Sequence, residues 1–128
     1  MSYPTDPTGP AANNVLDATV FQELHESLTQ PELLAAVYRK FVENAAVFIS
    51  ELRSQDVDSR SETLHTLKGS AAMMGAKTMA RLAEQMQAQG ASVQVETATQ
   101  QLAAELESFR AVVSDRLLAL GTSLHTPP

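Results

Sequence analysis

The chain contains no cysteine and no tryptophan, and aromatic residues occupy only 5% of its 128 positions. The lack of cysteine excludes a disulfide framework, a thiolate metal site and a cysteine nucleophile. Since 44% of the residues are nevertheless hydrophobic, a core must consist mainly of Leu, Val, Ala and Met, a composition that favours helices over strands. The length suits one domain with a single core.

Long apolar runs and an excess of positive charge are also missing. No segment approaches the roughly 18 apolar residues of a membrane span, and the opening MSYPTDPTGPAANN lacks the pattern of a secretory signal. We therefore expect a cytoplasmic protein that does not contact membrane. The net charge of −6 argues against nucleic acid as a partner. Residues 63–83, however, hold three cations and no acid, which suits docking to a small anion or an acidic patch.

Helical periodicity fills the chain between two polar segments, residues 1–14 and 121–128, which we predict to be flexible tails. Over residues 15–120 we expect an all-α fold, an up-and-down antiparallel four-helix bundle with a short additional N-terminal helix that covers one end. The predicted core positions recur at spacings of three and four: Phe21, Leu24, Leu28, Leu34, Val37, Phe41, Ala45, Phe48, Leu52, Leu64, Leu67, Ala71, Met74, Met79, Leu82, Met86, Val95, Leu102, Leu106, Phe109, Val113, Leu117 and Leu120.

Capping residues predict where the helices begin and end. Asp17, Asp56 and Ser92 are candidate N-caps for the first, third and last helices. Thr29-Gln30-Pro31-Glu32 has the spacing of a capping box, with Thr29 as the N-cap of the second helix. Gly75 is the predicted C-cap of the third helix, because glycine adopts the left-handed conformation without a steric penalty, and Gly90 is the predicted stop of the fourth helix.

The segment from Leu64 to Gly75 is the one that indicates chemistry. On a helical wheel, the predicted core positions of this segment gather on one side, and His65 falls nearly opposite them, together with Lys68 and Gly69. A neutral imidazole is a good nucleophile near pH 7. An ammonium one turn away can meet phosphoryl oxygens, and a glycine leaves room for a partner. A glycine inside a helix costs about 1 kcal/mol relative to alanine, and such a broken rule is typical of a functional site.

The sequence HTLKGSAAMMGA resembles the signature of histidine-containing phosphotransfer (HPt) domains, H-x-[apolar]-K-G-[small]-[small]-x-x-[apolar]-G, at every fixed position. The resemblance continues through AKTMARLAEQMQ and, as a helix layout, over about residues 15–120. It implies that His65 is phosphorylated at Nε2, that Lys68 supports the phosphoryl group and that Gly69 admits the partner. It also implies that Gln87 hydrogen-bonds the imidazole.

The same resemblance implies the partners. His65 would take the phosphoryl group from an aspartyl phosphate of one response-regulator receiver domain and give it to another, downstream of a hybrid sensor histidine kinase. The chain itself would bind no cofactor, since Mg²⁺ is expected on the receiver, and we expect it to act as a monomer without autonomous kinase activity.

Two other functions fit parts of the sequence. A histidine kinase also carries its histidine on a helix, but it needs a nucleotide-binding domain with a Gly-rich lid, and this chain has only five Gly. In a structural or adaptor bundle, His65 would be an incidental surface residue, as most lone helical histidines are. His25 and His125 have no second ligand at helical spacing, and the methionines suit core packing better than metal binding.

Overall fold

The protein is described by a computed structural model over residues 14–124. These residues form helices and turns, without a strand. The all-α prediction is therefore confirmed. The elements are α2 (Ala18–Leu28), α3 (Pro31–Glu51), the short 3-10 helix η1 (Leu52–Ser54), α4 (Val57–Met73), α5 (Lys77–Gln89), the 3-10 helix η2 (Gly90–Ser92) and α6 (Val95–Ala119). Among residues 14–124, no helix combines the length and the hydrophobicity that crossing a membrane requires.

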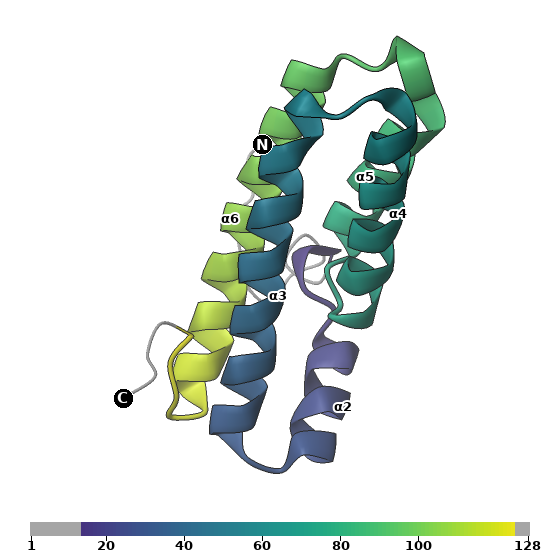
Figure 1. Ribbon diagram of the computed structural model, residues 1–128. Coiled ribbons are helices and arrows are strands. Elements are labelled where there is room, and N and C mark those ends of the chain that lie inside the picture. Colours follow the sequence, from purple (N-terminus) through teal and green to yellow (C-terminus); the bar gives the residue numbers. More distant parts are fainter. Residues whose placement is uncertain (1–13, 125–128) are drawn as a thin grey trace, which may run out of the picture.

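The helices form the predicted up-and-down bundle. The long helices α3 and α6 run side by side, and the antiparallel pair of α4 and α5 packs against one half of them (Figure 1). The short helix α2 lies beyond the end of that pair and alongside the first half of α3. The extra N-terminal helix thus covers one end of the α4–α5 pair, as the sequence predicted.

The core is aliphatic around a small aromatic centre. The ring of Tyr38, on α3, lies 5.6 Å from that of Phe21 and 6.0 Å from that of Phe109, and Phe41 meets Phe109 edge-on at 5.4 Å. All of the predicted core positions are buried or packed against the core. On α3 the buried stripe also takes in Ala35, Tyr38 and Ile49, which the pattern missed, whereas Val37 and Phe48 are only half-buried.

Two predicted N-caps and both glycine stops are confirmed. The Asp17 carboxylate accepts a hydrogen bond from the backbone N–H of Thr19 at 2.9 Å, and that of Asp56 accepts one from Ser59 at 2.8 Å. Gly90 follows the last residue of α5 with a φ of 54°. Because each carboxylate satisfies an N–H that the first helical turn leaves free, these residues fix where α2 and α4 begin.

Two other predicted caps are wrong. Thr29 is the C-cap of α2, with a φ of 63°. Only Thr29 and Gln30 separate α2 from α3, so Thr29 must reverse the chain and cannot take the extended conformation of an N-cap. Ser92 lies in η2 and donates its hydroxyl to a backbone carbonyl of Gln89 at 2.7 Å. The buried Val93 keeps the chain extended there, which delays the start of α6.

The turn between α4 and α5 is tied to both preceding helices. Gly75 has a φ of 79°, as predicted for a left-handed stop. Its carbonyl accepts a hydrogen bond of 2.7 Å from the backbone N–H of Asp17, and the Asp17 carboxylate pairs with Lys77 at 3.2 Å. The buried Tyr38 hydroxyl donates to the carbonyl of Met74 at 3.1 Å. One turn thus fixes α4 and α5 against α2 and α3.

The opposite end of the α4–α5 pair is tied by Arg60, which the sequence pattern did not single out. Its side chain is buried on α4 and donates hydrogen bonds to the carbonyls of Gln55 at 3.5 Å and Gly90 at 3.2 Å. A buried guanidinium is costly unless its donors are satisfied, so these bonds hold the first turn of α4 against the end of α5.

The folded unit extends past the predicted boundary at residue 120. Leu124 is buried in the core, and its carbonyl accepts a hydrogen bond from Arg39 at 3.4 Å. The last described residues therefore pack against the bundle. Residues 1–13 and 125–128, which make up the rest of the two predicted tails, lie outside the described residues.

We predict opposite effects of alanine at Gly75 and Gly69. A Cβ at Gly75 would lie 3.1 Å from the Cβ of Val20 and 3.3 Å from Asp17, on a left-handed backbone, so Gly75→Ala should lower the free energy of unfolding by about 1 kcal/mol or more. A Cβ at Gly69 would meet nothing within 4 Å, so Gly69→Ala should raise it by up to ~1 kcal/mol. Urea unfolding of both variants tests this, and a stabilised Gly75→Ala would contradict the packing of the turn.

Candidate functional site

The site is built on the face of α4 that points away from the core. Leu64, Leu67 and Ala71 face inward and are fully buried, whereas His65 and Gly69 are exposed on the other side. Their positions follow from the helical period, since residues four apart share one face. The sequence prediction that His65 faces solvent is confirmed. Within residues 14–124, no hydrogen bond or ion pair occupies the imidazole.

Lys68 lies on the same side of α4 and is bound to a carboxylate of the neighbouring helix. Its Nζ is 3.4 Å from Oε1 of Glu84 on α5. Both side chains are substantially exposed, by 40% for Lys68 and 62% for Glu84. Water screens such a pair, so the contact is weak and the ammonium can exchange partners.

Gln87 contacts α4 about one turn before His65, whereas Lys68 lies about one turn after it. Its half-buried amide donates hydrogen bonds to the carbonyl of Ser61 at 3.2 Å and to the Ser61 hydroxyl at 3.1 Å. Ser61 lies one turn before His65 on α4. The structure thus places Gln87 beside the histidine face, and a hydrogen bond from the imidazole Nδ1–H to the side-chain oxygen of Gln87 stays a prediction.

The surface around Gly69 is open. A Cβ at this position would meet no atom within 4 Å outside its own helix, and Gly69 lies inside α4 rather than at its end. His65, Gly69 and Met73 follow one another at spacings of four residues, so they form one row along the exposed face. The Met73 side chain is 76% exposed. A partner that reaches His65 along this row meets no obstacle at Gly69.

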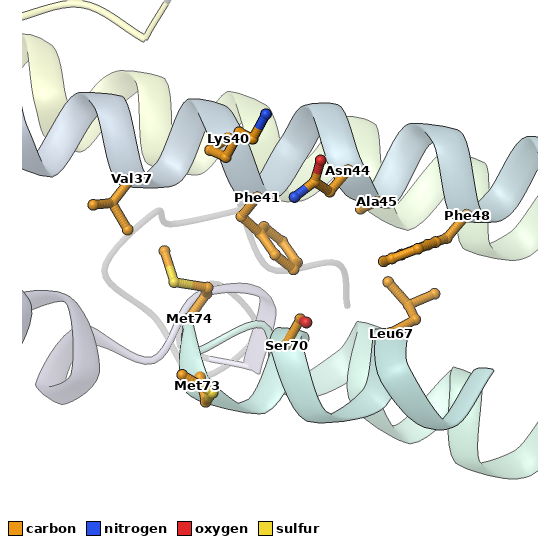
Figure 2. Close-up of a pocket in the computed structure, with 10 residues that line it drawn as sticks. All are labelled: Val37, Lys40, Phe41, Asn44, Ala45, Phe48, Leu67, Ser70, Met73 and Met74. Carbon is orange, nitrogen blue, oxygen red and sulfur yellow. The ribbon is translucent and has the colours of Figure 1, made fainter. Parts of the chain in front are cut away.

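The row leads to a groove between α3 and α4 with a volume of about 300 Å³. In Figure 2, Phe41 and Phe48 project from α3 toward Leu67 and Ser70 on α4. Val37 and Phe48, which the sequence placed fully in the core, line this groove, and this explains why they are only half-buried. The remaining lining residues are Lys40, Asn44, Ala45, Met73 and Met74.

The arrangement allows an imidazole nitrogen of His65 to act as a nucleophile toward a small anionic group. It presents an accessible nucleophile, a cation one turn away and open space beside them. Among the described residues, no three His, Asp or Glu side chains gather where they could share a metal ion.

His65, Lys68, Gly69 and Gln87 are predicted from the sequence, whereas Glu84, which contacts Lys68, is not. A signal was present, since α4 and α5 form a hairpin about Gly75. Residues at nearly equal distances from that glycine along the chain must meet, as Lys68 meets Glu84 and Ser61 meets Gln87. Counting outward from the turn brings the two members of each pair to within two residues of the same level, which is close enough for their side chains to meet.

We predict that Gln87→Ala destabilises the fold more than Ser61→Ala. The first substitution leaves both the carbonyl and the hydroxyl of Ser61 without their amide partner, which should lower the free energy of unfolding by about 1 kcal/mol. The second keeps the hydrogen bond to the carbonyl and should cost less. Urea unfolding curves measure both, and a Gln87→Ala protein as stable as the wild type would argue against this contact.

A comparison with known protein families gives one match. The family model described as Hpt domain matches residues 18–112, which span α2 to α5 and most of α6. No curated protein and no solved structure matches the chain significantly. Hpt domains take part in histidine phosphotransfer in two-component phosphorelays, where they interact with receiver domains and kinases. The match covers most of the chain and includes the whole HTLKGSAAMMGA segment, so this protein belongs to the Hpt domain family.

Proposed function

We propose that His65 accepts a phosphoryl group from the aspartyl phosphate of one receiver domain and passes it to the aspartate of another. The observation that carries the proposal is an exposed imidazole that shares one open helix face with an ammonium and a glycine. Family membership supports it, because Hpt domains take part in histidine phosphotransfer and the matched residues 18–112 include His65, the histidine of the segment HTLKGSAAMMGA.

In the proposed step, the Nε2 lone pair of His65 attacks phosphorus while the proton stays on Nδ1. The N–P bond forms as the O–P bond of the acyl phosphate breaks, and the electron pair leaves with the aspartate carboxylate of the receiver. Mg²⁺ on the receiver would neutralise the charge on the transferring oxygens. Lys68 would meet the phosphoryl oxygens after transfer, and Gln87, close by on α5, would orient the imidazole.

The open surface around His65 supports receiver domains as the partners. A receiver must bring its phosphoaspartate close to the imidazole, and Gly69 leaves that approach open. The chain supplies a positioned nucleophile and the receiver supplies the metal, which accounts for the small number of polar groups in the site. A monomeric state and a cytoplasmic location remain predictions from the sequence.

We predict that His65→Gln abolishes phosphoryl acceptance and leaves the fold intact. The side chain faces solvent, so helicity and melting temperature should stay close to those of the wild type. The assay mixes the full chain with receiver domains charged with labelled acetyl phosphate in the presence of Mg²⁺. Label on the His65→Gln protein would contradict the assignment of the nucleophile.

The same assay with labelled ATP in place of the receiver separates this function from that of a kinase, because the chain alone should stay unlabelled. An adaptor bundle, in turn, would take no label from any receiver. Each alternative left open by the sequence therefore gives a different pattern of labelling.

We also predict that Gly69→Gln slows transfer without unfolding the protein. A long side chain one turn from His65 would obstruct the receiver, whereas the free space around Gly69 accepts the substitution within the domain itself. The initial rate of transfer should fall markedly for Gly69→Gln and less for Gly69→Ala, the matched control with a short side chain. Equal rates for both variants and the wild type would show that no partner surface passes over Gly69.

A further inference from the structure

Lys68, the cation of the site, forms an ion pair with Glu84. Neither the sequence motif nor the family match gives Glu84 a role. Lys68 Nζ lies 3.4 Å from Glu84 Oε1, so the ammonium has an anionic partner before any phosphoryl group arrives. Glu84 and Gln87 are one turn apart on α5, and their partners Lys68 and Ser61 lie on either side of His65 along α4. The helix α5 therefore presents a carboxylate and an amide beside the histidine face.

The position of the Glu84 backbone near this face does not depend on its ion pair with Lys68. The hairpin of α4 and α5 is fixed at one end by the hydrogen bonds of Met74 and Gly75 and at the other by the bond from Arg60 to Gly90. The Glu84 side chain is 62% exposed and that of Lys68 40% exposed, but the four-carbon stem of the lysine gives its charged group the wider reach. The lysine can turn toward a new anion, and the carboxylate would stay behind.

Phosphorylation of His65 would set two anions in competition for this ammonium. A phosphoryl group carries close to two negative charges and three acceptor oxygens, against one charge and two oxygens on Glu84. Lys68 would therefore move to the phosphoryl group, and Glu84 would lose its partner. An unpaired carboxylate beside a new anion raises the free energy of the phosphorylated form relative to the unphosphorylated form.

We propose that Glu84 is a positioning residue that acts through Lys68. In the unphosphorylated domain it holds the ammonium beside His65, and after transfer it competes with the phosphoryl group for that ammonium. The competition keeps the phosphohistidine from becoming too stable, so the group can be passed on to a second receiver. This inference rests on the proposed function and adds to it a residue that sets the transfer equilibrium.

The test compares Glu84→Gln with the wild type at equilibrium. Full-length protein is mixed with one isolated receiver domain that has been charged with acetyl phosphate and freed of excess donor, and the phosphate on each partner is measured. Glu84→Gln should shift the equilibrium toward phosphohistidine by about two- to fivefold, the range expected for an exposed ion pair. Because water and salt screen such charges, the shift should shrink as ionic strength rises.

Two controls separate this role from a general charge effect. Glu107→Gln removes the same charge from another exposed ion pair, that of Glu107 with Arg110 on α6, and should leave the equilibrium unchanged. In a Lys68→Gln background, the effect of Glu84→Gln should fall by half or more, because the residue through which it acts is gone. Glu84→Ala should behave as Glu84→Gln does, and neither should change helicity.

The outcomes distinguish the two claims. A labelled wild type with an unchanged or opposite equilibrium in Glu84→Gln would overturn the role of Glu84 and leave the proposed function standing. An equal shift in Glu107→Gln would also overturn that role. If neither a charged receiver nor phosphoramidate, a direct chemical donor, labels His65 in the wild type, the proposed function itself fails.

Discussion

The hydrogen bonds that hold the α4–α5 turn against α2 and α3 are the constraint on which the rest of the site depends. Gly75 reverses the chain with a φ of 79°, and its carbonyl and that of Met74 receive hydrogen bonds from α2 and α3. Because these bonds fix the end of α4, they also fix its rotation about its own axis. Because Leu64, Leu67 and Ala71 face the core, the row of His65, Gly69 and Met73 on the other side of α4 faces solvent.

Because the α4–α5 hairpin is held firmly against the core, its solvent-exposed face can stay open around His65. The hairpin of α4 and α5 is tied at both ends, so the exposed face between them needs few contacts of its own. His65 and Gly69 therefore contribute little to the stability of the fold. The polar contacts beside them are the exposed ion pair of Lys68 with Glu84 and the half-buried contact of Gln87 with Ser61. A carrier of a transferable group needs such a face, because its partner must approach closely and leave again.

The fold and the candidate site could be predicted from the sequence where local signals agreed. Helical spacing placed the core, and Asp17, Asp56 and Gly75 marked the helix ends because their side chains or backbone act on their own helix. Thr29 and Ser92 failed because tertiary demands overrode local capping. Contacts that join helices, such as those of Arg60 and Tyr38, depend on how α4 packs against its neighbours, which a one-dimensional pattern does not contain.

The most direct measurement of the central claim is to locate the phosphoryl group itself. The wild-type chain, labelled by a charged receiver domain, can be studied by ³¹P and ¹⁵N NMR and by mass spectrometry of its peptides. We expect one phosphoryl group on Nε2 of His65, in a bond that is stable in base and labile in acid. A phosphoryl group on His25, on a hydroxyl or on a carboxylate would contradict the account.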